Sequence, residues 1–563
     1  MIGVVESAHL SGDKMKTIVL GLVAAVLAAT VHAAAPEFTP DGFARHIRVL
    51  ASDEFEGRAP ASPGEKKSVD YIVRQFRAAG LQPGGDPLPG GRRAWTQQVP
   101  LGHFQFDGAV NTRVNLRGVV QDWTQGEQLS LRPSQVGMQR LVVDNAPIVF
   151  AGYGVKAPER NWDDFKGADL KGKVVLVLVN DPDFETGVGD FGGKAMTYYG
   201  RWTYKYEEAA RQGALGFLVV HERRSAGYGW TTVKNSIEDV MDVVRANPRE
   251  AHAPLEGWIQ RDATAELLKA AGLDFETLKQ QAQTREFRPV ELPGVTFSTE
   301  FRTKAEQVVS HNVVGILPGK RHPREHVFYT AHWDHLGIGR PDASGDRTYH
   351  GAVDNASGVS ALIEVARVLA RGPRPDRSLV FMSTTAEEKA LLGAEYYAMN
   401  PLYPLATTVA VLNMDGMNVF GRTRDMSAAG ESPLTLLDDM IRIAKSHGLT
   451  YTPEQHPENG SYFRNDHFPF AKRGIPALTF GGGSMLESGG SGAADAAYLA
   501  YNRDKYHQPA DKYDPAWDLR GMVQEMEVFR DLGLDLANSR RWPDWKPGAE
   551  FKAARDATRA MRP

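Results

Sequence analysis

The chain has 563 residues, of which 42% are hydrophobic and 24% charged, a composition typical of folded globular proteins and a length that fits several domains. Its formal net charge of −4 offers no basic field for nucleic acid. Cysteine is absent. Disulfides, thiolate metal sites and a cysteine nucleophile are therefore excluded, and any metal site has to use histidine and carboxylate ligands.

The first 35 residues have the pattern of a secretory signal peptide. Lys16 is followed by an apolar run at residues 18–29 and by small residues at 33–35. The run is shorter than the ~20 residues that a membrane span needs. We therefore expect export to the periplasm or the medium, cleavage after Ala33 or Ala35, and no stable membrane insertion afterwards. A buried N-terminal helix is the alternative interpretation, and Met15 is an alternative start of translation.

Residues 43–81 predict helices on either side of a loop. One set of apolar residues recurs at helical spacing: Val69, Ile72, Val73 and Phe76. Gly80 supplies a helix stop. The loop contains the acidic stretch 53–58, and a second loop rich in proline and glycine covers residues 87–91.

Residues 140–290 predict a different, β-rich unit. Apolar runs at 147–150, 174–179 and 215–220 predict strands, with a helix before the last of them. The segment contains neither a cluster of metal ligands nor an obvious nucleophile.

From about residue 305 the pattern alternates between strand and helix. Strands are predicted at 313–317, 327–330, 379–383 and 409–412, and helices at 356–369 and 388–398. This alternation predicts an α/β fold with a mostly parallel, largely buried mixed sheet flanked by helices. In such sheets the active site lies beyond the carboxyl ends of the strands.

Metal-binding residue types occur at these strand ends and in the neighbouring loops. The candidates come from five segments far apart in the sequence: His332, Asp354, Glu388, Asp415 and His507. Each residue alone has an ordinary alternative, such as a helix N-cap for Asp354 or a solvated first helical turn for Glu388. Those alternatives do not explain why all five are expected at one rim of the sheet.

The chemistry of these residues suits zinc, which binds imidazole nitrogen and carboxylate oxygen. Two metal ions ~3.5–4 Å apart need a shared ligand and can act on one water. Asp334 lies two residues after His332, on the same face of an extended strand, where a carboxylate can fix the imidazole tautomer. Of the adjacent Glu387 and Glu388, one can be a ligand and the other a general base.

These motifs resemble those of the two-zinc exopeptidase family that includes bacterial leucyl aminopeptidases and glutamate carboxypeptidase II. They are A-H-W-D-H, V-D-N-A-S-G, A-E-E, N-M-D and Y-H-Q-P-A-D, in the family's order between residues 331 and 511. The resemblance implies two Zn²⁺ ions per chain. His332 and Asp415 would bind one ion and Glu388 and His507 the other, with Asp354 as the bridge.

The same resemblance implies the catalytic roles. Glu387 matches the general base and Asp334 the residue that orients His332. Tyr506 matches the position that in some members donates a hydrogen bond to the oxygen of the tetrahedral intermediate.

Two departures from the family pattern leave the ligands untouched. Ala61 and Ser62 replace a common glycine-threonine pair. Asn465 replaces the serine of a serine-aspartate-histidine motif, so Asp466 and His467 are expected to be structural or to support the ligands.

The resemblance covers nearly all of the mature chain and implies its domains. These are a signal peptide at 1–35, the N-terminal part of the peptidase domain at 36–139, an inserted protease-associated domain at 140–290, the catalytic domain at 291–545 and a tail at 546–563.

The expected activity is hydrolysis of a terminal bond of a peptide substrate; the oligomeric state is open. A receptor-like binding protein, as in transferrin receptor, would have lost zinc ligands, whereas all five and the base are present here. Aminoacyl cyclisation uses the same scaffold with fewer metals and without the inserted domain.

The sequence favours an aminopeptidase over a carboxypeptidase. The loops 459–466 and 481–495 are expected to wall the pocket, and Arg464 is their only basic residue, against the acids Asp466, Glu487 and Asp495. This balance favours capture of an ammonium group. Arg201 or Arg211 of the insertion can instead supply a carboxylate grip, so a carboxypeptidase is the alternative.

Overall fold

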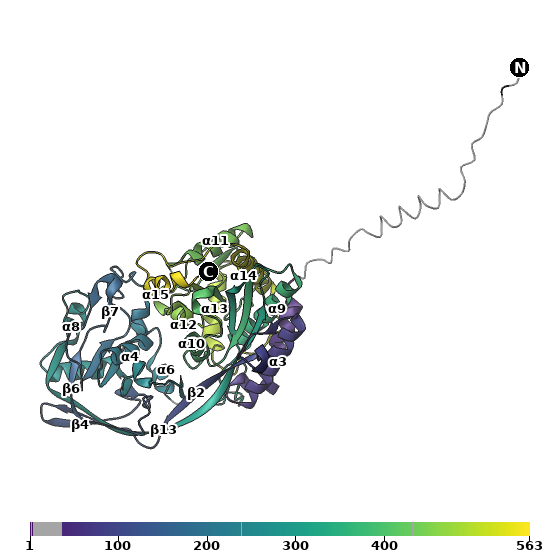
Figure 1. Cartoon of the computed structure of the whole chain (residues 1–563). Helices are drawn as coiled ribbons and strands as arrows, with labels where there is room; N and C mark the ends of the chain where they lie inside the picture. Colours follow the sequence, from purple (N-terminus) through teal and green to yellow (C-terminus); the bar gives the residue numbers. More distant parts are fainter. Residues whose placement is uncertain (2, 4–36, 238, 431–432, 563) are drawn as a thin grey trace. The chain divides into compact units, whose positions relative to one another are not determined.

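The computed structural model of the chain describes residues 1, 3, 37–237, 239–430 and 433–562 (Figure 1). The predicted signal peptide lies almost wholly outside these residues. Phe38 onward forms one unit of mutually contacting elements, which is the unit described below. Among the described residues, none of the helices combines the length and the apolar character that crossing a membrane requires.

The two predicted N-terminal helices are present as α2 (Pro40–Leu50) and α3 (Pro63–Ala79). The side chain of Thr39 caps α2 by accepting a hydrogen bond from the Gly42 amide. Gly80, with φ of 90°, ends α3 in the left-handed conformation that glycine adopts readily. Both helices pack against α9 (Gly358–Arg371).

A mixed, mostly parallel sheet forms the centre of the C-terminal half. Its strands, in spatial order, are β13 (Val290–Leu317), β17 (Arg377–Thr384), β14 (His322–His332), β18 (Thr408–Asn413) and β21 (Ala477–Gly482). β14 is parallel to β17 and β18, β18 is parallel to β21, and only β13 is antiparallel to its neighbour β17. The predicted α/β fold is confirmed.

Helices cover both faces of this sheet, as the alternation of side chains along β14 shows. Tyr329 donates a hydrogen bond to the carbonyl of Phe529 in α14 (Arg520–Asn538). The neighbouring Phe328 points to the opposite face, where its ring packs against Tyr397 of α10 (Leu392–Met399) and Phe470 of α12 (Phe468–Ala471). A sheet buried on both faces explains why its strands are continuous apolar runs.

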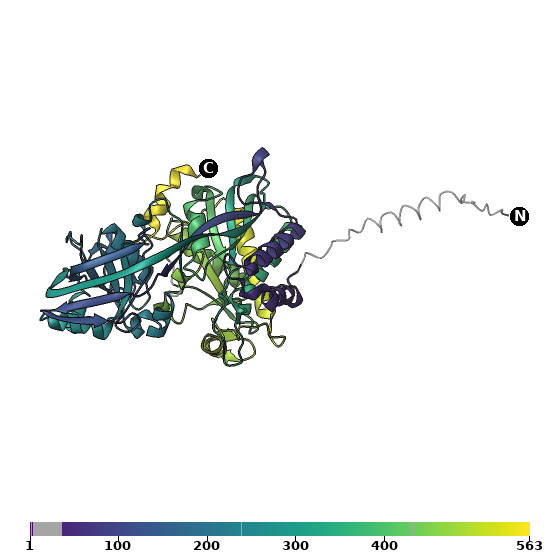
Figure 2. The ribbon, with the colours of Figure 1, turned by 90° about the horizontal axis from the view of Figure 1, so that it is seen from below.

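A second group of strands is connected to the first through β13, the long teal strand of Figures 1 and 2. The first part of β13 pairs with β3 and β6, and its later part with β2 and β17. The other members are β2 (Thr96–Phe106), β3 (Asn111–Leu116), β4 (Val119–Trp123), β5 (Leu129–Leu131), β6 (Arg140–Phe150), β9 (Val174–Leu178), β10 (Gly216–His221), β11 (Val240–Val243) and β12 (Leu255–Gln260). The β-rich character expected of residues 140–290 is present, but the group already begins at β2, before residue 140. Its resemblance to a protease-associated domain stays a prediction.

Shorter elements complete the fold. In the N-terminal half they are β1 (Gln82–Pro83), β7 (Lys156–Ala157), β8 (Trp162–Asp163), α4 (Trp202–Arg211), α5 (Arg223–Ala226), α6 (Trp230–Asn235), α7 (Arg261–Ala270) and α8 (Phe275–Gln281). In the C-terminal half they are β15 (Gly337–Ile338), β16 (Thr348–Tyr349), β19 (Asp425–Ala428), α11 (Thr435–Ser446), β20 (Thr450–Tyr451), β22 (Met485–Leu486), β23 (Gly490–Ser491), α13 (Ala493–Asp504) and α15 (Lys552–Ala557).

One predicted helix starts later than expected. The helix predicted from Glu388 begins only at Leu392, because Ala386, Ala390 and Leu391 have positive φ values of 52°, 80° and 64°. Such values interrupt a right-handed helix. Glu388 therefore lies in an irregular loop rather than in a first helical turn.

Candidate metal centre

The predicted ligands meet at the carboxyl ends of the parallel strands, as the sheet geometry requires. His332 is the last residue of β14. Glu388 lies in the loop after β17, and Asp415 lies two residues beyond the end of β18. Asp354 precedes α9, and His507 follows α13.

Three of these side chains form a first set. Nε2 of His332 lies 3.3 Å from Oδ1 of Asp354 and 3.2 Å from Oδ1 of Asp415. Ligand atoms of the three residues all lie within 4.8 Å of one another, which is close enough to hold one metal ion.

A second set adjoins the first and uses the other oxygen of Asp354. Nε2 of His507 lies 3.1 Å from Oδ2 of Asp354 and 3.1 Å from Oε2 of Glu388. All five predicted ligands are thus brought together in two sets that share Asp354. That carboxylate is placed as a bridging ligand would be.

His335 lies in the second set, although the motifs predicted it to be a non-ligand. Its Nδ1 lies 2.6 Å from Oε1 of Glu388, and it forms with Asp354 and Glu388 a second group able to hold a metal ion. The ring is fully buried, and neither of its nitrogens makes a hydrogen bond among the described residues. The second histidine of the A-H-W-D-H motif was the available signal.

The residues present fit two metal ions. Nδ1 of His335 and Oε1 of Glu388 face each other at 2.6 Å without the geometry of a hydrogen bond, and Nε2 of His335 is buried without a hydrogen-bond partner in the described part of the chain. Burial first, and then the negative charges of Asp354 and Glu388, raise the pKa of Asp415 against the opposing effect of His332. Unpaired nitrogens beside crowded carboxylates are the donors that zinc prefers.

Asp334 supports the site in a different way from the one expected. Nδ1 of His332 lies 3.1 Å from the backbone carbonyl of Asp334, and 3.7 Å from its carboxylate. An Nδ1–H bonded to this carbonyl leaves Nε2 as the ligand atom. The carboxylate itself accepts hydrogen bonds from the amides of Glu387 and Glu388, at 3.0 and 3.3 Å. It therefore holds the loop that carries these two residues.

Glu387 lies at the edge of the first set, with Oε2 4.0 Å from Nε2 of His332. Burial, and next to it the negative charges of Asp415 and Glu388, hold the pKa of Glu387 well above its usual range, although His332 opposes them. A carboxylate that takes up a proton readily is suited to be a general base.

Asp466 and His467 lie behind the site. Asp466 accepts a hydrogen bond from the hydroxyl of Thr384, at the end of β17. Nδ1 of His467 lies 2.8 Å from the hydroxyl of Thr479 in β21. Both side chains are buried between strand ends, a placement compatible with the supporting role expected of them.

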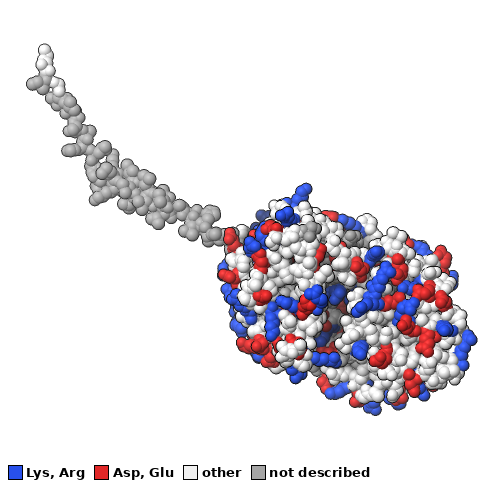
Figure 3. Space-filling model, turned by 180° about the vertical axis from the view of Figure 1, so that it is seen from behind, with Lys and Arg blue, Asp and Glu red and all other residues white. Residues whose placement is uncertain are grey.

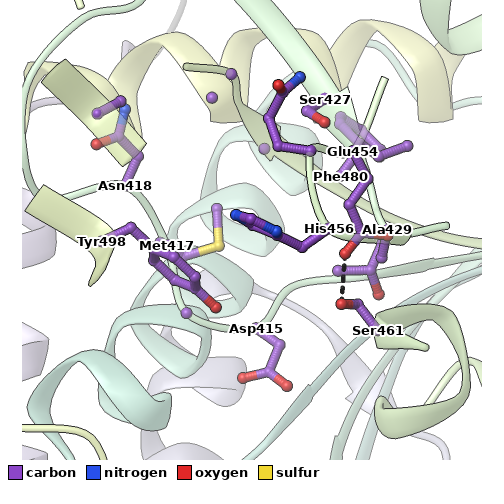
Figure 4. A pocket seen from close by; sticks show the side chains of 18 of the residues that line it. Asp415, Met417, Asn418, Ser427, Ala429, Glu454, His456, Ser461, Phe480 and Tyr498 are labelled. Atoms are coloured by element: carbon purple, nitrogen blue, oxygen red, sulfur yellow. Dashed lines mark hydrogen bonds between the residues drawn. The ribbon is translucent and has the colours of Figure 1, made fainter. Parts of the chain in front are cut away.

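A pocket opens in front of the two sets (Figure 4). Asp354, Glu387 and Asp415 line it together with Tyr506, whose ring stacks on His507 with centroids 3.8 Å apart. Figure 4 shows further lining side chains from separate segments: Met417, Asn418, His456, Phe480 and Tyr498. It also shows the hydrogen bond that the hydroxyl of Ser461 donates to Glu454.

The predicted pocket walls are partly correct. Arg464 and Asp495 line the pocket. Glu487 instead pairs with Arg422, 3.3 Å away, and neither Glu487 nor the buried Asp466 is among the lining residues. On the face shown in Figure 3, basic and acidic side chains are interspersed rather than gathered by sign.

The fold and the site together define a class of protein. Two histidine–carboxylate sets that share one carboxylate, at the carboxyl ends of a mostly parallel sheet, fit the metal site of a hydrolase. Residues 312–528 match the family described as Peptidase family M28. This match confirms the predicted family resemblance over residues 312–528.

Relatives and solved structures are similar over different lengths. Aminopeptidase NAALADL1 of Mus musculus is 29% identical over 257 residues, 39% of this chain and 30% of the relative. Aminopeptidase YwaD of Bacillus subtilis (strain 168) is 38% identical over 90 residues, 16% of this chain and 17% of the relative. An aminopeptidase structure from Aneurinibacillus sp. strain AM-1 has a TM-score of 0.47 at 18% identity, covering 89% of this chain and 95% of that one. The matched part thus spans less than a third of these two curated relatives.

Proposed function

We propose that the chain is an exported exopeptidase with two zinc ions that removes amino-terminal residues from peptides by hydrolysis. The observation that carries the proposal is the sharing of Asp354 between two ligand sets, with Glu387 beside them at the pocket. His332 and Asp415 would hold one ion, and Glu388 and His507 the other. Zinc bound there would polarise the scissile carbonyl and lower the pKa of a water.

The chain's own residues supply the proton transfers. A carboxylate oxygen of Glu387 accepts a proton from the attacking water and then gives it to the nitrogen of the leaving amine. The backbone amide of Glu387 donates a hydrogen bond to Asp334, and this contact fixes the residue that carries the carboxylate. Burial raises the pKa of Tyr506 well above its ordinary value, so its hydroxyl stays protonated and can donate a hydrogen bond to the oxyanion.

The acidic lining supports capture of an ammonium group. Beyond the ligand sets and Glu387, the pocket is lined by the carboxylates of Glu454, Asp495 and Glu525, with Arg464 as its one arginine. Glu454 and Glu525 already accept hydrogen bonds from backbone amides. The half-buried Asp495 has no such partner among the described residues, and a carboxylate free of hydrogen bonds attracts a substrate ammonium.

A carboxypeptidase is the second candidate, because two arginines lie unpaired near the site. Neither Arg201 nor Arg464 has a hydrogen-bond or ion-pair partner for its guanidinium in the described part of the chain. Burial first, and then the positive charge of Arg464, lower the pKa of Arg201 to about 10. Two neighbouring guanidinium groups without an ion pair are suited to hold a substrate carboxylate.

A paired assay separates the two candidates. One peptide series is offered free, acetylated at the amino terminus, or amidated at the carboxyl terminus. An aminopeptidase cleaves the amidated peptide and spares the acetylated one. Cleavage of the acetylated but not the amidated peptide would replace this proposal by the second, and Arg464→Gln would then lower activity more than Asp495→Asn.

Export rests on the sequence of the first 35 residues. The expected mature chain begins near Ala34 or Pro36. An intact-mass measurement on protein recovered outside the cytoplasm tests this, and a mature chain that keeps residues 15–33 would refute cleavage.

A further inference from the structure

Arg58, in the acidic loop between α2 and α3, is a buried cation close to the metal centre. It is 1% exposed and donates four hydrogen bonds, all to backbone carbonyls. Nη1 binds the carbonyls of Leu50 and His350 at 2.7 and 2.6 Å. Nε binds that of Trp333 at 2.8 Å, and Nη2 that of Gly351 at 2.8 Å.

Asp511 binds the backbone amides of the residues that follow Gly351. This carboxylate is fully buried and accepts hydrogen bonds from the amide of Val353 at 3.0 Å and of Asp354 at 3.1 Å. The hydroxyl of Tyr501 donates a further bond to it, at 3.1 Å. The amide of Ala352 donates to the backbone carbonyl of Asp511, at 3.0 Å.

Segment 350–354 is therefore fixed between two opposite charges. Its carbonyls at 350 and 351 face the cation of Arg58, and its amides at 353 and 354 face the anion of Asp511. The fit is tight at Gly351, whose φ is 55°: a Cβ there would lie 2.7 Å from Nη2 of Arg58. The last residue of this segment is the carboxylate shared by both ligand sets.

We propose that Arg58 and Asp511 are positioning residues that clamp segment 350–354 and so set the Asp354 carboxylate between the two metal sites. The inference rests on the proposed two-zinc site. Charged hydrogen bonds to the backbone are strong and directional, and a displaced Asp354 would weaken both sites together. Residues that support metal ligands typically change metal affinity by about 10–100-fold when replaced.

The test uses Arg58→Lys, which keeps the charge but cannot reach four carbonyls, and Asp511→Asn, which keeps the shape but loses the charge. Arg377→Lys is the matched control. Arg377 is also fully buried and also donates to two backbone carbonyls, but it lies at the start of β17, away from the site. Asp354→Ala gives the reference for loss of the shared ligand itself.

The readout is zinc binding to metal-free protein, measured by competition with a chromophoric chelator, alongside the thermal midpoint of each metal-free variant. We expect both zinc affinities to fall about 10–100-fold in the Arg58 and Asp511 variants. In the Arg377→Lys control both affinities should stay at the wild-type value, even if its thermal midpoint falls as far as theirs. The double variant Arg58→Lys, Asp511→Asn should have the zinc affinity of whichever single variant binds zinc less tightly, because both residues act on one segment.

Wild-type affinities in the two single variants, or weakening of one ion alone, would overturn the clamp. If Arg58→Lys does not fold, the near-isosteric Asp511→Asn decides the question. A wild-type chain that binds no zinc would instead count against the proposed function, so the two failures are distinguishable.

Discussion

At the scale of single residues, the two neighbouring glutamates differ in the side chains that they contact. Glu388 meets His507 and His335 in the second set, whereas Glu387 lies beside His332 with a pKa held well above its usual range. Both depend on Asp334 for the position of their amides. Their roles should therefore differ although their side chains are chemically identical.

Replacement of these residues gives the sharpest residue-scale prediction. Glu387→Gln should keep its zinc and lose about 10²–10⁴-fold in kcat, because the proton acceptor is gone and the ligands remain. Glu388→Gln is the matched control and should lose zinc from one site. Turnover and zinc content are measured on the same preparations. Near-wild-type turnover by Glu387→Gln would remove it as the base.

The sequence could predict that the five candidate ligands lie together, because each stands next to a strand or helix end within a recognisable motif. It could not show that the carbonyl rather than the carboxylate of Asp334 faces His332, since both lie at one position in the chain. The role of Arg58 could not be predicted either, because its partners are backbone carbonyls up to 293 residues away in the sequence. A lone arginine in a loop carries no sign of such contacts.

At the scale of elements, β14 carries two buried histidines in different surroundings. His332 ends the strand at the candidate metal centre, whereas His326, 4% exposed in the middle of the strand, packs against Tyr403 with ring centroids 4.5 Å apart. Burial, and next to it the charge of Arg93, lower the pKa of His326 to about 4. The folded state thus disfavours the charged ring.

This shift predicts how stability depends on pH. Because the folded pKa lies below the unfolded value of about 6.5, the folded state binds fewer protons, and stability is full above pH 6.5 and lost as the pH falls towards 4. The loss is at most about 3 kcal/mol. His326→Phe should show a smaller fall in the urea midpoint between pH 7.5 and 5 than wild type. An equal fall in both proteins would contradict this origin.

Strands were easier to predict than the helix that follows Glu388. Buried strands such as β17 and β18 are continuous apolar runs, and their bounds extend the predicted ranges by only one or two residues. The Glu-Glu-Lys run looks like a helical first turn. It is nevertheless held as a loop by the hydrogen bonds that its first two amides donate to Asp334 and by the positive φ values at Ala390 and Leu391. Tertiary contacts overrode local propensity there.

At the scale of the whole described unit, β13 connects both groups of strands, and side chains add contacts between them. Tyr198 packs on Phe468 with centroids 5.1 Å apart, and Lys472 pairs with Glu207 at 2.7 Å. The sequence predicted two kinds of unit but not a 28-residue strand shared by both. Strand pairing depends on distant partners, which a local pattern does not specify.

Asp354 joins two ligand sets, which we propose form one site for two ions. Elemental analysis of protein purified without chelator measures how many ions the chain holds. We expect about two zinc ions per chain, as in a co-catalytic pair. One ion per chain in fully folded protein, with no second ion taken up when zinc is supplied in excess, would contradict it.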